Sequence, residues 1–454
     1  MLPRPSKNTQ QNLFHSQLRD MLDSNDSLVA LAERIEWDEL ESSFEKYYSD
    51  EGRPAKPIRL MIGLLLLKQL KDISDEELIL QWKQNPYYQY FCGFGEFQIA
   101  YPCHPTDLVY FRKRIGKEGV EKIFEISVKM HGKDAEEKQV IVDTTVQEKD
   151  VTYPTDGKLA IKMIRHLHRI AQTEKIQLRR TYVKEIKGHR ISLRFFRHPK
   201  KIKKARAAMK RLETIAGILM RDISRNLNEQ KLSEYLKTFE LFQKVIDQKQ
   251  KDKGKIYSLH EPHIYAIAKG KDHKKYEYGT KASIVTTKQS GIIVGVAAHP
   301  NNEHDSKTLK AALQSANANR TLPVKEAICD RGYRGAKEVE GAVISIPGIP
   351  LKRDTAYQKE QKRKKFKRRA AIEPVIGHLK SDHRLSRNYL KGFIGDEINL
   401  LLAASAFNLK KWMNYFLLSV FILKTALFVY ALLSNREDKR RKYAELYLLL
   451  FRLC

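Results

Sequence analysis

The sequence predicts an α/β protein in which helices flank a mixed sheet, with an all-α region before it and a helical insertion after its first strand. Short runs of β-branched residues bounded by charge, such as KQVIVDTTVQ, indicate buried strands. Amphipathic segments of helical length between them would cover the faces of the sheet. No strand pattern comes before residue 134, so residues 1–133 are expected to be helical.

The composition indicates a partner with many negative charges. At 454 residues the chain is long enough for two or three domains, and its net charge is +30. The cations are clustered, which favours nucleic acid as the partner over a merely solubilising surface. The four cysteines lack CxxC spacing and the N-terminus lacks the apolar run of a signal peptide, so we expect a cytoplasmic protein with reduced thiols.

The helices before residue 134 have three possible roles. Pro57 precedes a long apolar segment, Ser74 and Glu77 form a capping box, and Thr106 begins a further helix. A helix-turn-helix DNA reader, a dimerisation bundle and a purely structural cap all fit this pattern.

Asp143 lies in the middle of the first predicted strand. Thr144, Thr145 and Val146 continue the strand past it, which argues against an aspartate that ends a strand by capping a turn. An ionisable group in a buried strand is costly unless it is paired or binds a metal. Asp143 is therefore a candidate metal ligand.

Residues 158–255 are predicted to form a basic helical insertion. In the first half, to Arg211, Glu174 and Glu185 are the only acids among many lysines and arginines. Aromatic and small polar residues interleave with these cations, which suits a surface that follows DNA phosphates. The second half is more balanced in charge and is typical of a helical hairpin or a dimer arm.

A second carboxylate, Asp330, ends a short strand and directly precedes Arg331-Gly332-Tyr333. A carboxylate at the carboxyl end of a strand, followed by a glycine turn, is where α/β folds place chemistry. Before it, two β-branched runs from about Tyr276 predict a hairpin. Asp305 is expected to cap the helix that follows the hairpin.

A third carboxylate, Glu373, lies in the basic stretch KRKKFKRRAAIEPVIGHLKSDHR. In one continuous helix Phe366, Arg369, Glu373 and Lys380 would share a face. Proline suits only the first turn of a helix, however, so Pro374 predicts a helix start near residue 372 or a kink.

Asp143, Asp330 and Glu373 together suit two metal ions, and Mg²⁺ is the expected metal because it prefers carboxylate and phosphate oxygens. Phosphodiester chemistry needs little more from a protein than positioning and charge. The motif HEPH at 260–263 lacks the spacing of a zinc site, and without a GxxxxGK loop no nucleotide cofactor is expected.

Residues 412–433 are nearly continuously apolar and long enough to span a membrane. Lys424 near their middle would cost about 2.5–3.5 kcal/mol on insertion. A packing helix that lacks its partner, or an extension outside the folded domain, is preferred to a membrane span. Residues 412–454 are predicted to be a hydrophobic C-terminal tail.

The chain resembles the DDE transposases of bacterial insertion sequences, most closely the insertion-sequence-five family, over roughly residues 30–412. The resemblance rests on IVDTTV around Asp143, CDRGYRG around Asp330 and RAAIEPVIGHLK around Glu373. The last segment also fits a wider signature of Tyr, two residues, Arg, three residues, Glu, six residues and Lys. Phe366 stands at the tyrosine position, so the hydroxyl of that position is absent or supplied elsewhere.

The resemblance implies a ribonuclease-H-like catalytic domain over residues 134–411, with Mg²⁺-dependent cleavage and strand transfer at inverted terminal DNA ends. It implies that residues 1–133 bind DNA or form dimers. In this interpretation the residues Asp143, Asp330 and Glu373 are the catalytic metal ligands, while Arg369 and Lys380 hold phosphates.

Phe366 is predicted to stack on a base displaced from the duplex, or else to be a core aromatic. Because two DNA ends must be held, a homodimer is expected, associated with the nucleoid. Two alternatives stay open: a non-catalytic DNA-binding protein derived from a transposase, and a structure-selective DNA nuclease.

Overall fold

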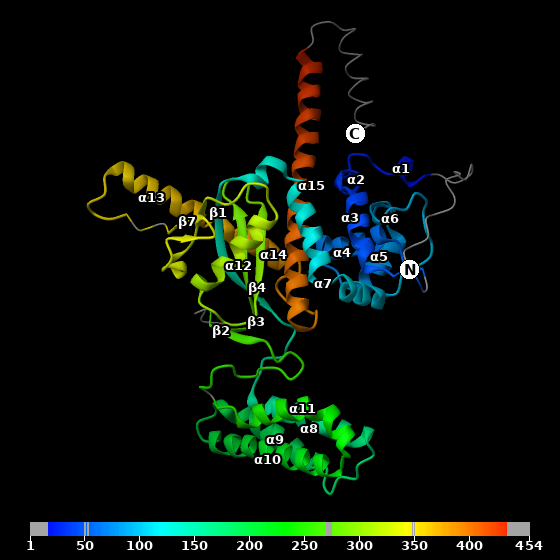
Figure 1. Cartoon of the computed structure of the whole chain (residues 1–454), viewed down its shortest axis with the longest axis vertical. Coiled ribbons are helices and arrows are strands. Elements are labelled where there is room, and N and C mark those ends of the chain that lie inside the picture. The colour runs from blue at the N-terminus through cyan, green and yellow to red at the C-terminus, as the bar shows by residue number, and fades with distance from the viewer. Residues whose placement is uncertain are drawn as a thin grey trace.

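The computed structural model describes residues 17–49, 51, 54–249, 251–268, 275–346, 348 and 350–433. Figure 1 shows a central sheet with a group of N-terminal helices beside it, a helical bundle below it and one long helix projecting above it. The predicted fold class is confirmed: a mixed sheet flanked by helices, an all-α N-terminal region and a helical insertion after the first core strand.

The N-terminal region packs around the apolar helix α4. The helices described here are α1 (Leu18–Met21), α2 (Ser27–Arg34), α3 (Trp37–Phe44), α4 (Ile58–Lys71), α5 (Asp75–Gln84), α6 (Pro86–Phe91) and α7 (Pro105–Lys129). Ser74 caps α5 by accepting a hydrogen bond from the Glu77 amide, as its sequence predicts. Gly116 kinks α7 with a φ of 58°, so this helix is made of two segments.

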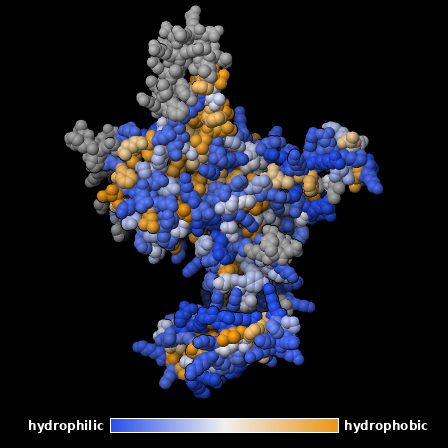
Figure 2. Space-filling view, turned by 180° about the vertical axis from the view of Figure 1, so that it is seen from behind, coloured by the Kyte–Doolittle hydropathy of each residue, from blue (hydrophilic) through white to orange (hydrophobic). Residues whose placement is uncertain are grey.

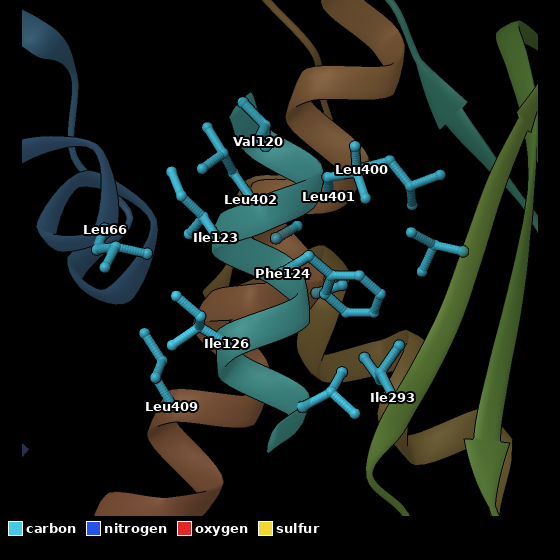
Figure 3. Packing of buried hydrophobic residues seen from close by; sticks show 14 of the residues in the cluster. Leu66, Val120, Ile123, Phe124, Ile126, Ile293, Leu400, Leu401, Leu402 and Leu409 are labelled. Atoms are coloured by element: carbon cyan, nitrogen blue, oxygen red, sulfur yellow. The ribbon is translucent and has the colours of Figure 1, made fainter. Parts of the chain in front are cut away.

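The N-terminal region and the sheet share one apolar core. Ile123 and Ile126 of α7 point toward Leu66 of α4, whereas Phe124 points toward Ile293 on the sheet (Figure 3). All of these side chains are buried, and they belong to one continuous cluster of apolar residues. Helix α7 therefore fixes the N-terminal region against the sheet.

The sheet places β1 at its centre. Its strands are β1 (Gln139–Glu148), β2 (Tyr265–Ala268), β3 (Tyr276–Thr287), β4 (Ile293–His299), β5 (Glu326–Ile328), β6 (Glu338–Val339) and β7 (Ala342–Ser345). On one side β3 pairs antiparallel with β1, and both β2 and β4 pair antiparallel with β3. On the other side β5 pairs parallel with β1, β7 pairs parallel with β5, and β6 pairs antiparallel with β7. This topology is that of a ribonuclease-H-like core.

The insertion between β1 and β2 is a bundle with its own core. It contains α8 (Asp156–Thr173), α9 (Val183–Ser192), α10 (Ile202–Asn226) and α11 (Glu229–Asp247). Its buried apolar residues form a cluster separate from the core of the sheet. Hydrophilic side chains cover most of its visible surface in Figure 2, as its basic sequence predicts.

The remaining helices follow β4 in the chain. They are α12 (Asp305–Ala318), α13 (Ala356–Arg369), α14 (Ile372–Asp382) and α15 (Gly392–Leu433), with short 3-10 turns η1 (Glu45–Tyr47), η2 (Gly132–Glu136), η3 (Leu193–Arg197) and η4 (Arg331–Tyr333). Two of these helices, α12 and α15, pack against β4. The basic stretch is divided between α13 and α14, and α14 begins at Ile372 as Pro374 predicts. Phe366 and Glu373 therefore lie on different helices and do not share one helix face.

Helix α15 runs without a break through residue 412, where the hydrophobic tail was predicted to begin. Its first half is buried against α7 and α4 as far as Met413. Beyond that residue the helix projects from the protein (Figure 1), and as far as Val429 most of its apolar side chains are exposed. The projecting segment is largely hydrophobic in Figure 2. The segment Gly392–Val429 is long and apolar enough to cross a membrane. A single helix of this kind is weak evidence for a membrane span, because the core helix of a soluble protein can have the same length and composition.

Candidate active site

The register of the sheet places Asp143 beside Asp330. The parallel pairing of β1 with β5 aligns Ile141 with Ile328, and each aspartate lies two residues beyond that pair. The side chain of Asp143 is 20% exposed, so it is a partly exposed residue in the middle of a largely buried strand. Asp143 Oδ1 accepts a hydrogen bond of 2.7 Å from the amide of Thr144.

Asp330 is held by the turn that follows it. Its Oδ1 accepts a hydrogen bond of 2.8 Å from the amide of Gly332 and so caps η4. This contact fixes the carboxylate at the carboxyl end of β5, where the sequence predicts it.

Glu373 approaches the same region from the first turn of α14, which packs against β1. Arg369 lies between it and Asp143: the guanidinium is 3.4 Å from Glu373 Oε1 and 4.0 Å from Asp143 Oδ2. Glu373 is 62% exposed and Arg369 is 16% exposed, so the arginine is the more enclosed partner. The cation therefore compensates the first and third predicted ligands in this conformation.

Phe366 and Lys380, the other two predicted DNA contacts, lie on α13 and α14. Phe366 is 50% exposed on α13, and the Arg369 guanidinium is 5.7 Å from the centre of its ring. It is thus a surface aromatic, not a core residue. Lys380 is half-buried on α14, about two turns beyond Glu373.

Arg368 holds α13 in place over the hairpin turn. Its guanidinium donates hydrogen bonds to the backbone carbonyls of Lys288 and Gln289 at 2.5 and 2.6 Å. α13 has no buried residue and exposes lysines and arginines along its length, so it carries a cationic surface next to the carboxylates.

Asp305 is a member of this group that the sequence did not identify. It was expected to cap α12, but His304 is the capping residue, and Asp305 is the first residue of the helix. Its Oδ1 instead accepts hydrogen bonds from Thr144 Oγ1 at 3.0 Å and from Lys281 Nζ at 3.1 Å. The sequence contains one sign of this arrangement. His304 directly precedes Asp305, and a histidine side chain can itself accept the hydrogen bond that caps the helix.

Tyr333 lies beneath the aspartates. It is 1% exposed, and its hydroxyl has no hydrogen-bond partner in the described part of the chain. Burial raises the pKa of Tyr333, and the negative charges of Asp143, Asp305 and Asp330 raise it further. The hydroxyl therefore stays protonated and is a donor close to three carboxylates.

The chemistry of these donors fits a divalent metal that prefers oxygen, but their present arrangement is not a closed coordination sphere. Among the described residues, no three His, Cys, Asp or Glu side chains converge as a metal site. Arg369 stands where a cation shared by Asp143 and Glu373 would lie. A metal there would require the arginine to move away.

Two protein-family models match the chain. One is described as Transposase domain (DUF772) and covers residues 16–114; the other is described as Transposase DDE domain and covers residues 249–409. The second match contains Asp330 and Glu373, whereas Asp143 lies before it.

A curated relative is the uncharacterized protein ORF8 in the nfe locus of Rhizobium meliloti. It is 36% identical over 203 residues, which are 44% of this chain and 98% of the relative. A search of solved structures found no significant match. The assignment to the insertion-sequence-five family stays a prediction. The two domain matches, together with the ribonuclease-H-like core, establish that this chain belongs to the DDE transposases of insertion sequences, enzymes that act on DNA.

Proposed function

We propose that this protein cleaves DNA at the inverted terminal ends of an insertion sequence and joins the freed 3′ ends to target DNA, with Mg²⁺ as its metal. The observation that carries the proposal is that Asp143 and Asp330 each lie two residues beyond the same paired position of β1 and β5, with Glu373 linked to Asp143 through Arg369. Residues far apart in the sequence contribute acids to one surface that is bordered by cations.

Asp143, Asp330 and Glu373 would hold the metal, because their carboxylates are the oxygen ligands that Mg²⁺ prefers. When bound, two such ions supply activation of the attacking oxygen and stabilisation of the leaving oxygen. The arrangement of one strand, one turn and one helix start gives these acids a rigid support.

Arg369 has a second role in this proposal. In the absence of DNA it compensates two carboxylates, and with DNA bound its planar guanidinium would hold a phosphate next to the scissile bond. Lys380 would bind a neighbouring phosphate. Phe366, exposed beside Arg369, would stack on a base that leaves the duplex at the cleaved end.

The cationic surfaces of α13 and of the insertion would carry the rest of the DNA, since phosphate contacts position a protein without reading sequence. We further propose that the protein works as a homodimer associated with the nucleoid, so that one assembly holds both ends. The mass of the DNA-bound complex tests the dimer, and a monomer on paired ends contradicts it.

Strand transfer by the purified full-length chain tests the proposed reaction. The chain is incubated with Mg²⁺ and DNA that carries candidate terminal repeats, and joining of 3′ ends to a target plasmid is measured. Joining is expected in the parent protein and lost in Asp143→Ala and Glu373→Ala. Glu360→Ala is a matched control, because Glu360 on α13 is 61% exposed and, like Glu373, pairs with a cation one helical turn away.

The same assay separates the alternatives. Cleavage without joining would leave only a structure-selective nuclease. Salt-sensitive DNA binding without any cleavage would indicate a non-catalytic DNA-binding protein.

A further inference from the structure

Asp305 faces Asp330 across Gly332. A methyl group placed on Gly332 would lie 3.0 Å from Asp305 Oδ2 and 3.0 Å from Asp330 Oδ1. Because Asp305 Oδ2 and Asp330 Oδ1 are both 3.0 Å from this methyl position, the two oxygens are at most 6.0 Å apart. Gly332 has no side chain, and it leaves the space between these carboxylates open.

The two oxygens of Asp305 have different surroundings. Thr144 and Lys281 both donate to Oδ1, and so they fix the orientation of the carboxylate. In the described part of the chain, no group donates a hydrogen bond to Oδ2, the oxygen that faces Asp330. One oxygen is thus held by the protein and the other is available to a ligand.

The hydroxyl of Tyr333 gives an independent indication of a ligand. A buried hydroxyl without a partner costs about 1–3 kcal/mol, so native proteins usually satisfy such groups. This hydroxyl is buried close to Asp143, Asp305 and Asp330, yet it donates to none of them. Water bound to a metal ion would donate a hydrogen bond to the oxygen of this hydroxyl and so give it a partner.

We propose that Asp305 is a fourth carboxylate of the metal site and shares an ion with Asp330 across Gly332. This inference rests on the proposed function, since it concerns the same metal. Mg²⁺ keeps several waters and needs only one or two carboxylates from the protein, so the pair is sufficient for one ion. Thr144 directly follows Asp143 on β1, and its hydrogen bond to Asp305 therefore couples the fourth acid to the first.

The chain supplies a matched control for the structural role of Asp305. Asp156 is likewise the first residue of a helix, α8, and likewise pairs with a lysine, Lys255, at 3.0 Å. It lies at the base of the insertion and faces no second aspartate across a glycine. If Asp305 served only its helix and its lysine, replacement of either aspartate would have similar consequences.

Titration of Mn²⁺ into the full-length chain tests the proposal. Mn²⁺ prefers the same oxygen ligands as Mg²⁺, and isothermal titration calorimetry measures its binding without any reaction. Asp305→Asn is expected to weaken Mn²⁺ binding by at least about tenfold. Asp156→Asn is expected to leave it unchanged. Thermal melting by circular dichroism establishes that each variant is folded.

Gly332→Ala provides the second test. It keeps all the carboxylates and fills the space between Asp305 and Asp330 with a methyl group, so it is also expected to weaken Mn²⁺ binding. It decides the question if Asp305→Asn does not fold. Parental affinity for Mn²⁺ in folded Asp305→Asn, or in Gly332→Ala where Asp305→Asn does not fold, overturns the proposal.

Asp330→Asn distinguishes failure of this inference from failure of the proposed function. If Asp330→Asn loses Mn²⁺ binding while Asp305→Asn retains it, the metal site stands without Asp305. If Asp330→Asn also binds Mn²⁺ as the parent does, the proposed metal site is wrong as a whole.

Discussion

Two groups of charged residues in this protein differ in how completely their charges are satisfied. The first, the junction cluster, consists of Lys149, Glu261, His263 and Asp396, at the point where β1, the end of the insertion and α15 meet. Lys149, Glu261 and Asp396 are at most 4% exposed. Asp396 accepts hydrogen bonds from Lys149 at 2.5 Å and from Asn388 at 2.6 Å, and its second oxygen lies 2.9 Å from His263.

The second, the proposed catalytic group, consists of Asp143, Asp305, Asp330 and Glu373 with Arg369 and Tyr333, and it is looser. Arg369 lies 3.4 Å from Glu373 and 4.0 Å from Asp143, and among the described residues the buried hydroxyl of Tyr333 has no hydrogen-bond partner. A buried charge with all its partners holds elements together, whereas carboxylates with incomplete partners retain the capacity to bind something else. Both groups contain aspartate and glutamate, so they differ in how fully the carboxylates are paired and not in the type of acid.

The largest effect is expected from Asp143→Asn. The amide cannot supply the negative charge that a metal requires, and loss of several kcal/mol of transition-state stabilisation should lower strand transfer by about 10⁴-fold. Unfolding by urea should change little, since Asp143 is partly exposed and is not enclosed as Asp396 is. A large fall in the free energy of unfolding would place Asp143 with the structural cluster instead.

Lys149→Met should have the opposite profile. It leaves Glu261 and Asp396 buried without their lysine, which typically costs about 3–5 kcal/mol of stability. Lys255→Met removes a lysine whose partner, Asp156, is 37% exposed, and should cost about 1 kcal/mol or less. Urea unfolding measures both. Equal costs would show that the junction cluster does not depend on its buried lysine.

His299, the last residue of β4, should make the stability of the protein depend on pH. It is 5% exposed, its Nε2 lies 2.8 Å from Ser283 Oγ, and burial lowers its pKa to about 4. Its folded pKa is below the unfolded value of about 6.5, so the unfolded chain binds the proton more readily. Stability should therefore fall by about 3 kcal/mol as pH falls from about 6.5 to 4.

Comparison with His299→Gln isolates this contribution from other titrating groups. The parent should lose more stability than the variant over that pH range in urea unfolding. Parallel pH profiles would mean that His299 is protonated without cost in the folded protein.

The sequence predicts most of the fold because its signals are local. The β-branched run around Asp143, the turn after Asp330 and the proline after Glu373 each determine the element that carries the acid. The sequence predicts a mixed sheet, but the parallel pairing of β1 with β5 that brings the first two acids together is seen only in the structure.

The sequence does not predict contacts of residues that could fill more than one role, or contacts between segments far apart in the chain. Asp305 resembles a helix cap, and only the structure shows that His304 takes this role and frees Asp305 to contact Thr144. Lys149 and Asp396 are 247 residues apart, and their pairing depends on how α15 docks on the sheet. Arg369 is the last residue of α13, and the position of this helix end brings its guanidinium to 4.0 Å from Asp143.

The smallest effect concerns the aromatic edge of the catalytic group. Phe366→Ala removes a half-exposed ring beside Arg369 and should weaken binding to DNA with an unpaired end by about 1 kcal/mol, roughly fivefold. Fully paired DNA should bind equally well to the parent and the variant, because the ring has no displaced base to stack on. Tyr357→Ala is the control, as Tyr357 is 70% exposed at the start of the same helix, about three turns before Arg369. Fluorescence anisotropy with both DNAs measures the difference, and an equal loss for Tyr357→Ala would show that any exposed aromatic of α13 contributes to binding independently of the catalytic carboxylates.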